Sequence, residues 1–468
     1  MILPFVLFAV FIVIALLVFL YSLYPGSQRV TTVPGLDPTT EVDGNVPDMQ
    51  KAGSLPQFLI NLHEEFGPVV SFWINRELII SVASPETHKA VAHLFDRPYS
   101  LFEPFLPLLG DRSIQLRNGP EGQHDRKLHD RSFTQAKIVQ KFSMIQQICE
   151  ELCDKWESVA GTGEHMPLSV NFSSLVMKSL TRFCFGDYFK DEEAMNAFTR
   201  DYNQCFHIME QSIFEGPMVP GSEKEKRFNK AIKNMREVAG EIISARKEAE
   251  IAPEDKIFID TLLDTYTDDD MVFDDIVTYL IGGSHTTSYY LTWAFCLLAK
   301  YQDVQEKAWK EVDEYYVEGP VTVDIMKNMK YLQNVMNEVM RYSKLAPYSA
   351  RKSSSDCIIS GHKIPKETPI IISAGTLMQN GDLWENPDEF DPDRFNKKIP
   401  AYGFEPFGFA GKRKCPGYRL TELESQMFIV LALKRFKVTL VPGQVVEPSY
   451  GLVTKPSEEI WILVEKRK

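Results

Sequence analysis

The chain begins with a run of apolar residues. Residues 2–20 are apolar throughout except for Pro4, and no charged residue precedes Arg29. About 20 apolar residues suffice for one membrane-spanning helix. A cleaved signal peptide is the alternative, but this run lacks a basic start and exceeds the usual apolar core of roughly 7–15 residues. The pattern therefore predicts a transmembrane anchor at residues 1–24.

Beyond this run, apolar residues recur mainly at helical spacing. Residues 25–53 contain Pro34-Gly35 and predict a turn-rich connector. The apolar stripe within residues 55–62 and the pattern of residues 134–250 both predict helices. Strand-like runs are short, and they occur at residues 69–72, 78–82, 357–373 and 460–464.

The predicted fold class is mainly α with small peripheral β-sheets. No linker or repeat interrupts residues 54–468, so this region is predicted to form a single domain. Between Asp275 and Lys300 no residue is charged, which makes a second membrane span the obvious alternative. The stretch from Gly282 to Ser288 is too polar to face lipid. It therefore predicts a helix that runs through the protein core and lines a cavity.

Charge and cysteine content narrow the possible functions. The formal net charge of −13 over 468 residues argues against nucleic acid as a partner. The seven cysteines are scattered and none belongs to a Cys-x-x-Cys pair, so a zinc site or a redox motif is not predicted.

One cysteine, Cys415, lies in a glycine-rich and basic loop just before a helix-like run. Neighbouring cations and a helix start favour a thiolate over a thiol. Pro416 suits the first position of that helix, and Gly411 and Gly417 allow a flat, bulky ligand to approach the backbone. The loop therefore predicts an axial metal ligand, with a buried or merely reactive cysteine as the alternative.

This loop resembles the haem-ligand loop of the cytochrome P-450 superfamily, whose pattern is Phe-x-x-Gly-x-Arg-x-Cys-x-Gly. Gly411, Arg413, Cys415 and Gly417 fall in frame, whereas Gly408 stands where the superfamily has Phe. The resemblance implies a cytochrome P-450-like haem-thiolate fold for the predicted domain. It also implies haem b as the cofactor and Cys415 as the axial ligand of its iron.

A second motif resembles the Glu-x-x-Arg helix and the Pro-Glu-Arg-Phe segment of the same superfamily. Glu338 and Arg341 lie three residues apart and so share a helical face. Arg394 follows downstream, with Asp393 in the place of the superfamily's Glu. The resemblance implies that Glu338, Arg341 and Arg394 form a buried network supporting the cysteine loop. Superficial charge pairing is the alternative.

The stretch from Gly282 to Thr287 resembles the superfamily's oxygen-binding segment. The resemblance implies that Thr286 hydrogen-bonds iron-bound dioxygen. His285 stands where the superfamily has an acid, and an imidazole near its ordinary pKa of about 6.5 can relay protons. A histidine buried in the core is the alternative.

Three arginines are candidates for the haem propionates, because a guanidinium matches a carboxylate bidentately. They are Arg126, Arg351 and Arg413. Arg126 fits the superfamily's Trp-x-x-x-Arg pattern, but Gly122 replaces the Trp. For Arg126 an exposed arginine in a charged run is an equal alternative.

Together the motifs imply an oxidoreductase, a membrane-bound haem-thiolate monooxygenase that inserts one oxygen atom from O2 into a lipophilic small molecule. No flavin or nucleotide fingerprint is present, so electrons are expected from a separate flavoprotein reductase. Residues expected to meet that reductase are basic, namely Lys412, Arg413, Lys414, Arg126, Lys127 and Arg131. A haem-thiolate isomerase or dehydratase of oxygenated lipids, or a non-enzymatic haem-binding protein, stays open.

The stretch from Val441 to Glu447 and the apolar start are most similar to the animal family-20 orphan branch of the superfamily. The resemblance implies a membrane location, in the endoplasmic reticulum with the catalytic domain facing the cytosol. Residues 99–109 and 204–218 are aromatic and apolar and are expected to line the substrate space. The sequence does not encode the identity of the substrate or the oligomeric state.

Overall fold

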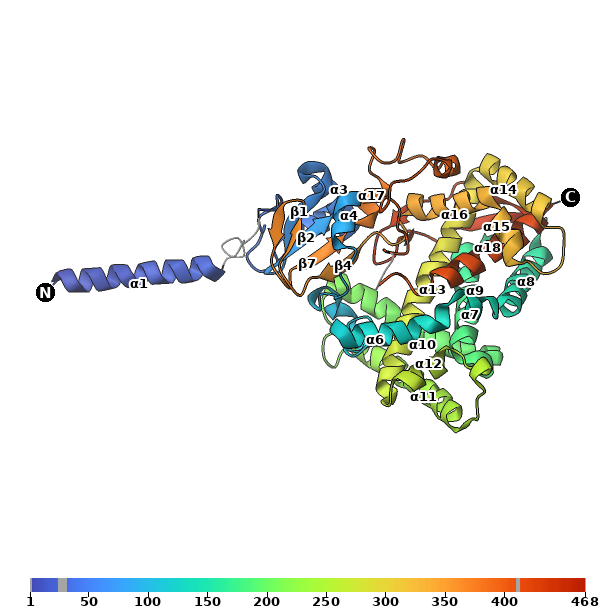
Figure 1. Cartoon of the computed structure of the whole chain (residues 1–468), viewed down its shortest axis with the longest axis horizontal. Helices are drawn as coiled ribbons and strands as arrows, with labels where there is room; N and C mark the ends of the chain where they lie inside the picture. Colours follow the sequence, from blue (N-terminus) through green and yellow to red (C-terminus); the bar gives the residue numbers. More distant parts are fainter. Residues whose placement is uncertain (1, 24–31, 410–412, 468) are drawn as a thin grey trace.

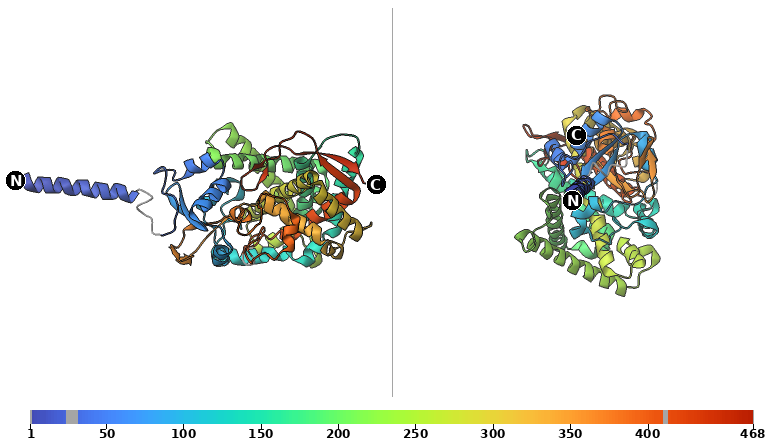
Figure 2. Two further views of the ribbon diagram at one scale, coloured as in Figure 1. Left: turned by 90° about the horizontal axis from the view of Figure 1, so that it is seen from above. Right: turned by 90° about the vertical axis from the view of Figure 1, so that its left-hand side faces the viewer.

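The computed structural model describes residues 2–23, 32–409 and 413–467. Helices dominate, and the strands of the described residues form four small sheets. The mainly α class predicted from apolar spacing is therefore confirmed. The largest sheet lies at one end of the body and the helices gather at the other, near the C-terminus (Figures 1 and 2).

The apolar run at the start of the chain folds as one helix, α1 (Ile2–Leu23). The large apolar side chains that the structure describes in α1 between Val6 and Tyr21 are exposed, those of Phe11 and Tyr21 to 68% each. Within the described residues, no helix combines the length and the apolarity that crossing a membrane requires. The prediction that residues 1–24 form a transmembrane anchor is therefore not supported.

Four strands form the sheet that borders the cavity described below, in the order β1-β2-β7-β4. They are β1 (Val69–Ile74), β2 (Glu77–Val82), β7 (Pro369–Ile372) and β4 (Ser349–Lys352). The β1–β2 hairpin turns at Asn75, whose φ of 51° is the left-handed conformation that Asn tolerates in tight turns. In the antiparallel β4–β7 pair, Arg351 lies opposite Ile370, so the sheet fixes the position of Arg351.

The helical core surrounds α13 (Asp269–Lys300), which is buried along most of its length as its uncharged sequence predicts. It packs with α8 (Phe142–Val159), α9 (Leu168–Phe185) and α18 (Tyr418–Arg435). Aromatic rings join these helices, with the centroid of Trp156 5.2 Å from that of Phe295 and 5.3 Å from that of Phe428. The apolar faces of the four helices therefore form one continuous core.

The remaining elements cover this core or connect its parts. The α-helices are α2 (Val46–Ala52), α3 (Leu55–Phe66), α4 (Pro85–Val91), α5 (Leu106–Leu109), α6 (Gly119–His129), α7 (Gln135–Val139), α10 (Glu192–Glu215), α11 (Glu223–Glu248), α12 (Phe258–Thr265), α14 (Gln302–Tyr315), α15 (Val323–Asn328), α16 (Lys330–Ser343) and α17 (Ala374–Met378). The 3-10 helices are η2 (Ser100–Phe105), η3 (Asp130–Phe133), η4 (Gly186–Lys190), η5 (Pro253–Asp255) and η6 (Pro392–Asn396). The small strands are β3 (Met166–Pro167), β5 (Cys357–Ile359), β6 (His362–Ile364), β8 (Phe436–Leu440), β9 (Pro448–Ser449), β10 (Lys455–Pro456) and β11 (Trp461–Lys466).

Candidate functional site

A cavity of about 340 Å³ lies between α13, α18, the large sheet and the loop that carries Cys415. Cys415, Thr286 and four arginine side chains all line it. On α13, the lining residues Tyr279, Gly282 and Thr286 recur at intervals of three and four, so they share one face of the helix. The structure therefore brings the predicted thiolate and the predicted oxygen-binding threonine to one enclosed space.

Cys415 is held by its backbone, whose N–H donates to the carbonyl of Phe407 at 2.8 Å. The following helix α18 begins at Tyr418, so Pro416 lies before the helix and not at its first position, as the sequence had suggested. Burial raises the pKa of the Cys415 thiol, whereas a backbone hydrogen bond from Gly417 and the charge of Arg126 act in the opposite direction. A buried thiolate of this kind is stabilised by a metal cation, as ligation requires.

Four guanidinium groups meet at the cavity, and of these Arg126 has a carboxylate partner, Asp130. Arg126, Arg351 and Arg413 were predicted there, and Arg97 joins them. Burial and the neighbouring positive charges lower the pKa of Arg351 to about 10 and that of Arg413 to about 9. Burial and the same neighbours also lower the pKa of Arg97 well below its usual value.

Two of these guanidiniums keep donors free for a bound anion. Among the residues that the structure describes, the buried Nε of Arg97 has no hydrogen-bond partner, and the Arg351 side chain donates to one group, the carbonyl of its neighbour Ala350, at 2.7 Å. Among the described residues no carboxylate forms an ion pair with Arg97 or Arg351. A ligand with carboxylates would supply the missing negative charge, and the two propionates of haem fit this donor set.

The other two guanidiniums mainly hold the cysteine loop. Arg413 donates to the carbonyls of Phe95, Ile114 and Arg117 at 3.2, 2.7 and 2.7 Å. Arg126 pairs with Asp130 at 2.7 Å and donates to the carbonyl of Lys414 at 2.5 Å. Their predicted contact with propionates stays a prediction. Gly411, the remaining candidate of this loop, lies outside the described residues.

Sequence analysis missed Arg97, because no local motif marks it. Its backbone N–H and carbonyl both bind the side chain of Asn118, at 2.9 Å each. This pair joins two loops that are 21 residues apart and turns the Arg97 side chain toward the cavity. Only tertiary structure reveals such a contact.

Gly122 and Gly408, the two glycines that replace superfamily aromatics, have different surroundings. A Cβ at Gly122 would lie 2.1 Å from the carbonyl oxygen of Arg117, so no larger residue fits there without rearrangement. Gly408 has a φ of 77°, a conformation that favours glycine, and it lines the cavity. Its neighbour Phe409 also lines the cavity and packs against His88, with ring centroids 5.4 Å apart.

Thr286 lies on α13 at the cavity wall, as predicted. Its hydroxyl donates to the carbonyl of Gly282 at 2.6 Å, one helical turn earlier. A Cβ at Gly282 would meet no atom within 4 Å, whereas one at Gly283 would lie 3.0 Å from the Leu180 side chain. The first glycine thus leaves room in the cavity, and the second lets α9 approach α13 closely.

His285 points elsewhere, and it is not among the residues that line the described cavity. Its ring stacks on Phe206, with centroids 3.7 Å apart, and lies near Tyr202 at 5.5 Å. Burial lowers the pKa of His285 to about 3, so the ring is neutral at neutral pH. Its predicted role in proton relay stays a prediction, and these aromatic surroundings weigh against it.

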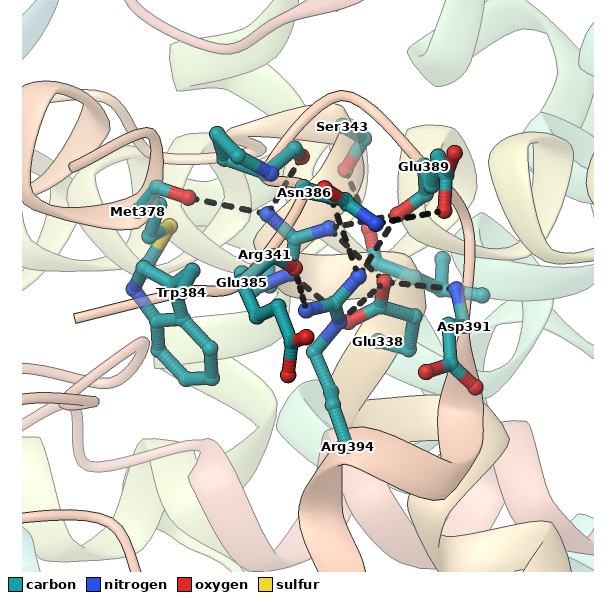
Figure 3. A network of polar contacts seen from close by, with 12 residues as sticks. Glu338, Arg341, Ser343, Met378, Trp384, Glu385, Asn386, Glu389, Asp391 and Arg394 are labelled. Carbon is teal, nitrogen blue, oxygen red and sulfur yellow. Dashed lines mark hydrogen bonds and ion pairs between the residues drawn. The ribbon is translucent and has the colours of Figure 1, made fainter. Parts of the chain in front are cut away.

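Glu338, Arg341 and Arg394 meet in one buried network (Figure 3). The carboxylate of Glu338 accepts two hydrogen bonds from Arg341 at 2.7 Å each and one from Arg394 at 3.0 Å. The backbone N–H of Asp391 donates to the same carboxylate at 2.9 Å. A buried carboxylate is tolerated when its oxygens are satisfied in this way.

The two arginines of this network also bind the chain downstream of α16. Arg341 donates to the carbonyls of Met378 and Pro387, at 2.9 and 2.8 Å. Arg394 donates to the carbonyl of Glu385 at 2.7 Å (Figure 3). The network therefore fixes the segment after α17 against α16, and its role is to hold the fold and not to react.

Two sets of predicted contacts differ in the structure. Arg126 and Arg413 are buried, so they cannot belong to an exposed basic patch, and Lys412 lies outside the described residues. Residues 99–109 and 204–218 were expected to line the substrate space, but those whose side chains the structure describes (99–109, 204–212 and 216–218) do not line the described cavity. Phe105 and Leu109, for example, are packed into the main core instead. The apolar wall of the cavity comes from α9, from α17 and from the segment after α16.

Comparison with known proteins agrees with this geometry. A family model described as Cytochrome P450 matches residues 34–464. The chain is similar to Cytochrome P450 20A1 of Homo sapiens, with 32% identity over 99% of this chain and 100% of that protein. It is 33% identical to Cytochrome P450 20A1 of Mus musculus with the same coverage. Cyclooctat-9-en-7-ol 5-monooxygenase of Streptomyces melanosporofaciens is 25% identical over 83% of this chain and 86% of that protein.

Proposed function

Because the chain belongs to the cytochrome P450 family and is a haem-b monooxygenase of that family, we propose that it oxidises a lipophilic small molecule with electrons from a separate reductase. The supporting observation is the single cavity in which Cys415, Thr286 and apolar side chains face the same space. Val176, Leu180 and Leu345 are among those apolar lining residues. A substrate must lose its hydrating water to enter this space, and an apolar molecule does so most readily.

Each group of the cavity then has a separate task. Cys415 holds the cofactor, and Arg97 and Arg351 bind its carboxylates. When bound, haem supplies the iron chemistry that activates O2. The Thr286 hydroxyl now donates to Gly282, and a rotation of its side chain would turn the same proton toward a ligand in the cavity. Glu338 and its two arginines maintain the position of the surrounding chain.

The proposed reductase would dock where basic side chains are exposed near the cysteine loop. Lys127 of α6 and Arg131 of η3 are exposed, and Lys414 is half-buried. These side chains are positively charged, whereas the whole chain has a net negative charge. They therefore complement an acidic partner.

The proposed function is tested by incubating the purified holoprotein with reductase, NADPH and an untargeted lipid extract. Products are identified by mass spectrometry against a Cys415→Ser control that lacks the thiolate. We expect at least one lipophile to gain one oxygen atom in the holoprotein alone. Conversion of a lipid peroxide without reductase, and no oxygen insertion with it, would instead indicate an isomerase or dehydratase.

The arginine cluster gives a second test that needs no substrate. We expect Arg97→Met to weaken haem binding by roughly 10- to 150-fold, since a hydrogen bond to a charged group contributes about 1.5–3 kcal/mol. Haem transfer to an acceptor protein measures this change. Arg76→Met, at an exposed position in the hairpin, is the matched control and should bind haem normally. Equal haem affinity of Arg97→Met and wild type would show that Arg97 does not contact the cofactor.

We further propose that α1 attaches the protein to a membrane, with the endoplasmic reticulum and its cytosolic face as the expected location. The exposed apolar side chains of α1 support this proposal, because their burial in lipid is favourable. Deleting residues 1–24 is expected to move the protein from the membrane pellet to the supernatant and to leave haem content unchanged. A truncated protein that resists alkaline extraction would contradict this assignment.

A further inference from the structure

A line of polar side chains, buried except for the half-buried Tyr279, runs away from the cavity wall, and only Tyr279 belongs to the site described above. It comprises Tyr266, which follows α12, Asp275 and Tyr279 of α13, and His129 of α6. The hydroxyl of Tyr266 donates to Oδ2 of Asp275 at 2.7 Å. Nε2 of His129 lies 4.0 Å from the same oxygen, and Nδ1 of His129 lies 3.2 Å from the Tyr279 hydroxyl.

This line connects two spaces. Tyr266 lines a shallow surface depression together with Arg117, His124 and Asp125. Tyr279 lines the cavity that contains Cys415. Between these ends, Asp275 and His129 have no exposed surface. A series of side chains with exchangeable hydrogens therefore leads from the surface depression to the cavity. One gap in this series, the 4.0 Å between Nε2 of His129 and Oδ2 of Asp275, is longer than a hydrogen bond.

That interval has an unsatisfied atom on one side. Nε2 of His129 is buried and has no hydrogen-bond partner in the described part of the chain, although most buried polar atoms have one. The other side is the carboxyl of Asp275, which already accepts from Tyr266 and from the backbone N–H of Ile114 at 2.5 Å. A small movement of the imidazole, or one bridging water, would complete the line.

We propose that Asp275, His129 and Tyr279 form a proton-transfer path between the surface depression and the cavity beside Cys415, with Tyr266 as its outer end. The inference rests on the proposed function, since a monooxygenase consumes protons as well as electrons. It also accounts for the position of His285, which stacks on Phe206 and faces away from the cavity.

The transfer is a series of exchanges in which no proton is gained or lost. The Asp275 carboxyl passes its proton to Nε2 of His129, while Nδ1–H of His129 passes its proton to the Tyr279 hydroxyl. The original hydroxyl proton of Tyr279 leaves into the cavity. Asp275 recovers a proton from the depression through Tyr266. The first tautomer of His129 returns by exchange with water, which gives a proton to Nδ1 and takes one from Nε2.

The ionisation of these groups suits this role. Burial raises the pKa of Asp275 to about 7, so at neutral pH this carboxyl both holds and releases a proton. Burial and the charges of Arg126 and Arg117 lower the pKa of His129 to about 3, so the ring is neutral and one nitrogen can accept. The groups that face Asp275 and His129 are Tyr266, Arg117, Asp274, Arg126, Tyr279 and Ile114 N–H.

The direct test is the infrared absorption of the Asp275 carboxyl in the holoprotein, which requires no substrate. Burial raises the pKa of Asp274 to about 6, that of Asp275 to about 7 and that of Glu424 to about 8, so we expect three carboxyls to lose their absorption in sequence as the pH rises. Asp275→Asn should lack the middle component, which titrates near pH 7. Asp274→Asn is the matched control, because Asp274 is the preceding residue but lies near Arg236, at 3.7 Å, and outside the path. It should keep the titration near pH 7.

The second readout is product formed per electron consumed, with peroxide release, across the same pH range. We expect Asp275→Asn and Tyr279→Phe each to lower this ratio by at least about tenfold, since a positioned proton donor typically contributes about 10²–10⁴-fold to a rate. In wild type the ratio should fall above pH 7, where Asp275 has lost its proton, and this dependence should vanish in Asp275→Asn. Haem content and the carbonyl spectrum should be unchanged.

The outcomes separate the path from the function itself. The path is overturned if Asp275→Asn removes no carboxyl absorption that titrates near pH 7 in wild type, or if it keeps the wild-type ratio and pH profile. The proposed function fails, and the path does not, if wild type oxidises no lipophile while the infrared titration appears as expected. Tyr279→Phe keeps the ring that stacks on Phe133, so its effect reports on the hydroxyl and not on folding.

Discussion

Cys415→Ala abolishes the thiolate-type absorption spectrum of the reduced carbonyl complex. This is the largest effect expected of any single substitution on the cofactor, because no other side chain can replace a thiolate as an axial ligand of this kind. The geometry of the loop supports the expectation, since Phe407 fixes the Cys415 backbone and Arg126 fixes the carbonyl of the preceding residue, Lys414. The measurement is the difference spectrum of the reduced protein with and without carbon monoxide.

A second cysteine provides the control for this experiment. Cys184 of α9 also lines the cavity, and burial raises the pKa of its thiol. It lacks the basic loop that surrounds Cys415, so Cys184→Ala should keep the thiolate-type spectrum. If Cys415→Ala keeps the spectrum and Cys184→Ala loses it, the ligand has been assigned to the wrong residue.

Glu338→Ala is expected to cost about 3–5 kcal/mol of unfolding free energy. The substitution removes the carboxylate to which both Arg341 and Arg394 donate, and it leaves two guanidiniums buried without their counter-charge. Haem should be lost together with folded protein, because the network holds the chain that surrounds the cavity. Urea denaturation of the holoprotein and its haem-to-protein ratio measure the two effects.

An exposed glutamate makes the comparison specific. Glu314 lies on the surface of α14, and Glu314→Ala should change stability by no more than about 0.5 kcal/mol. Should Glu338→Ala unfold at the same urea concentration as Glu314→Ala, the network would contribute no more than a surface charge does.

Much of the fold could be predicted because its signals are local. The helical stripe of α3, the hairpin at Asn75 and the uncharged length of α13 each follow from neighbouring residues. The pairing of Glu338 with Arg341 follows from their spacing of three, which places both on one face of α16. The exact ends of helices were predicted less well. The sequence suggested that α18 begins at Pro416, whereas it begins at Tyr418.

Features that depend on tertiary contacts could not be predicted in the same way. Arg97 reaches the cavity only because Asn118 binds its backbone. Arg126 lies in a charged run that suggests exposure, yet the packing of α6 under the cysteine loop buries it. His285 directly precedes Thr286 in sequence, but the helix turns about 100° per residue and so places its ring among aromatic side chains.

Because of the arginine cluster, the amount of this folded protein in a cell depends on how much haem is available. Before haem binds, the like charges of Arg97, Arg351 and Arg413 repel one another in a site that water screens poorly. A ligand that binds only the folded state adds RT ln(1 + [L]/Kd) to its stability, about 4 kcal/mol when free ligand exceeds Kd a thousandfold. Cells that limit haem would therefore hold less of the folded chain and degrade more of it, without any change in the rate of its synthesis.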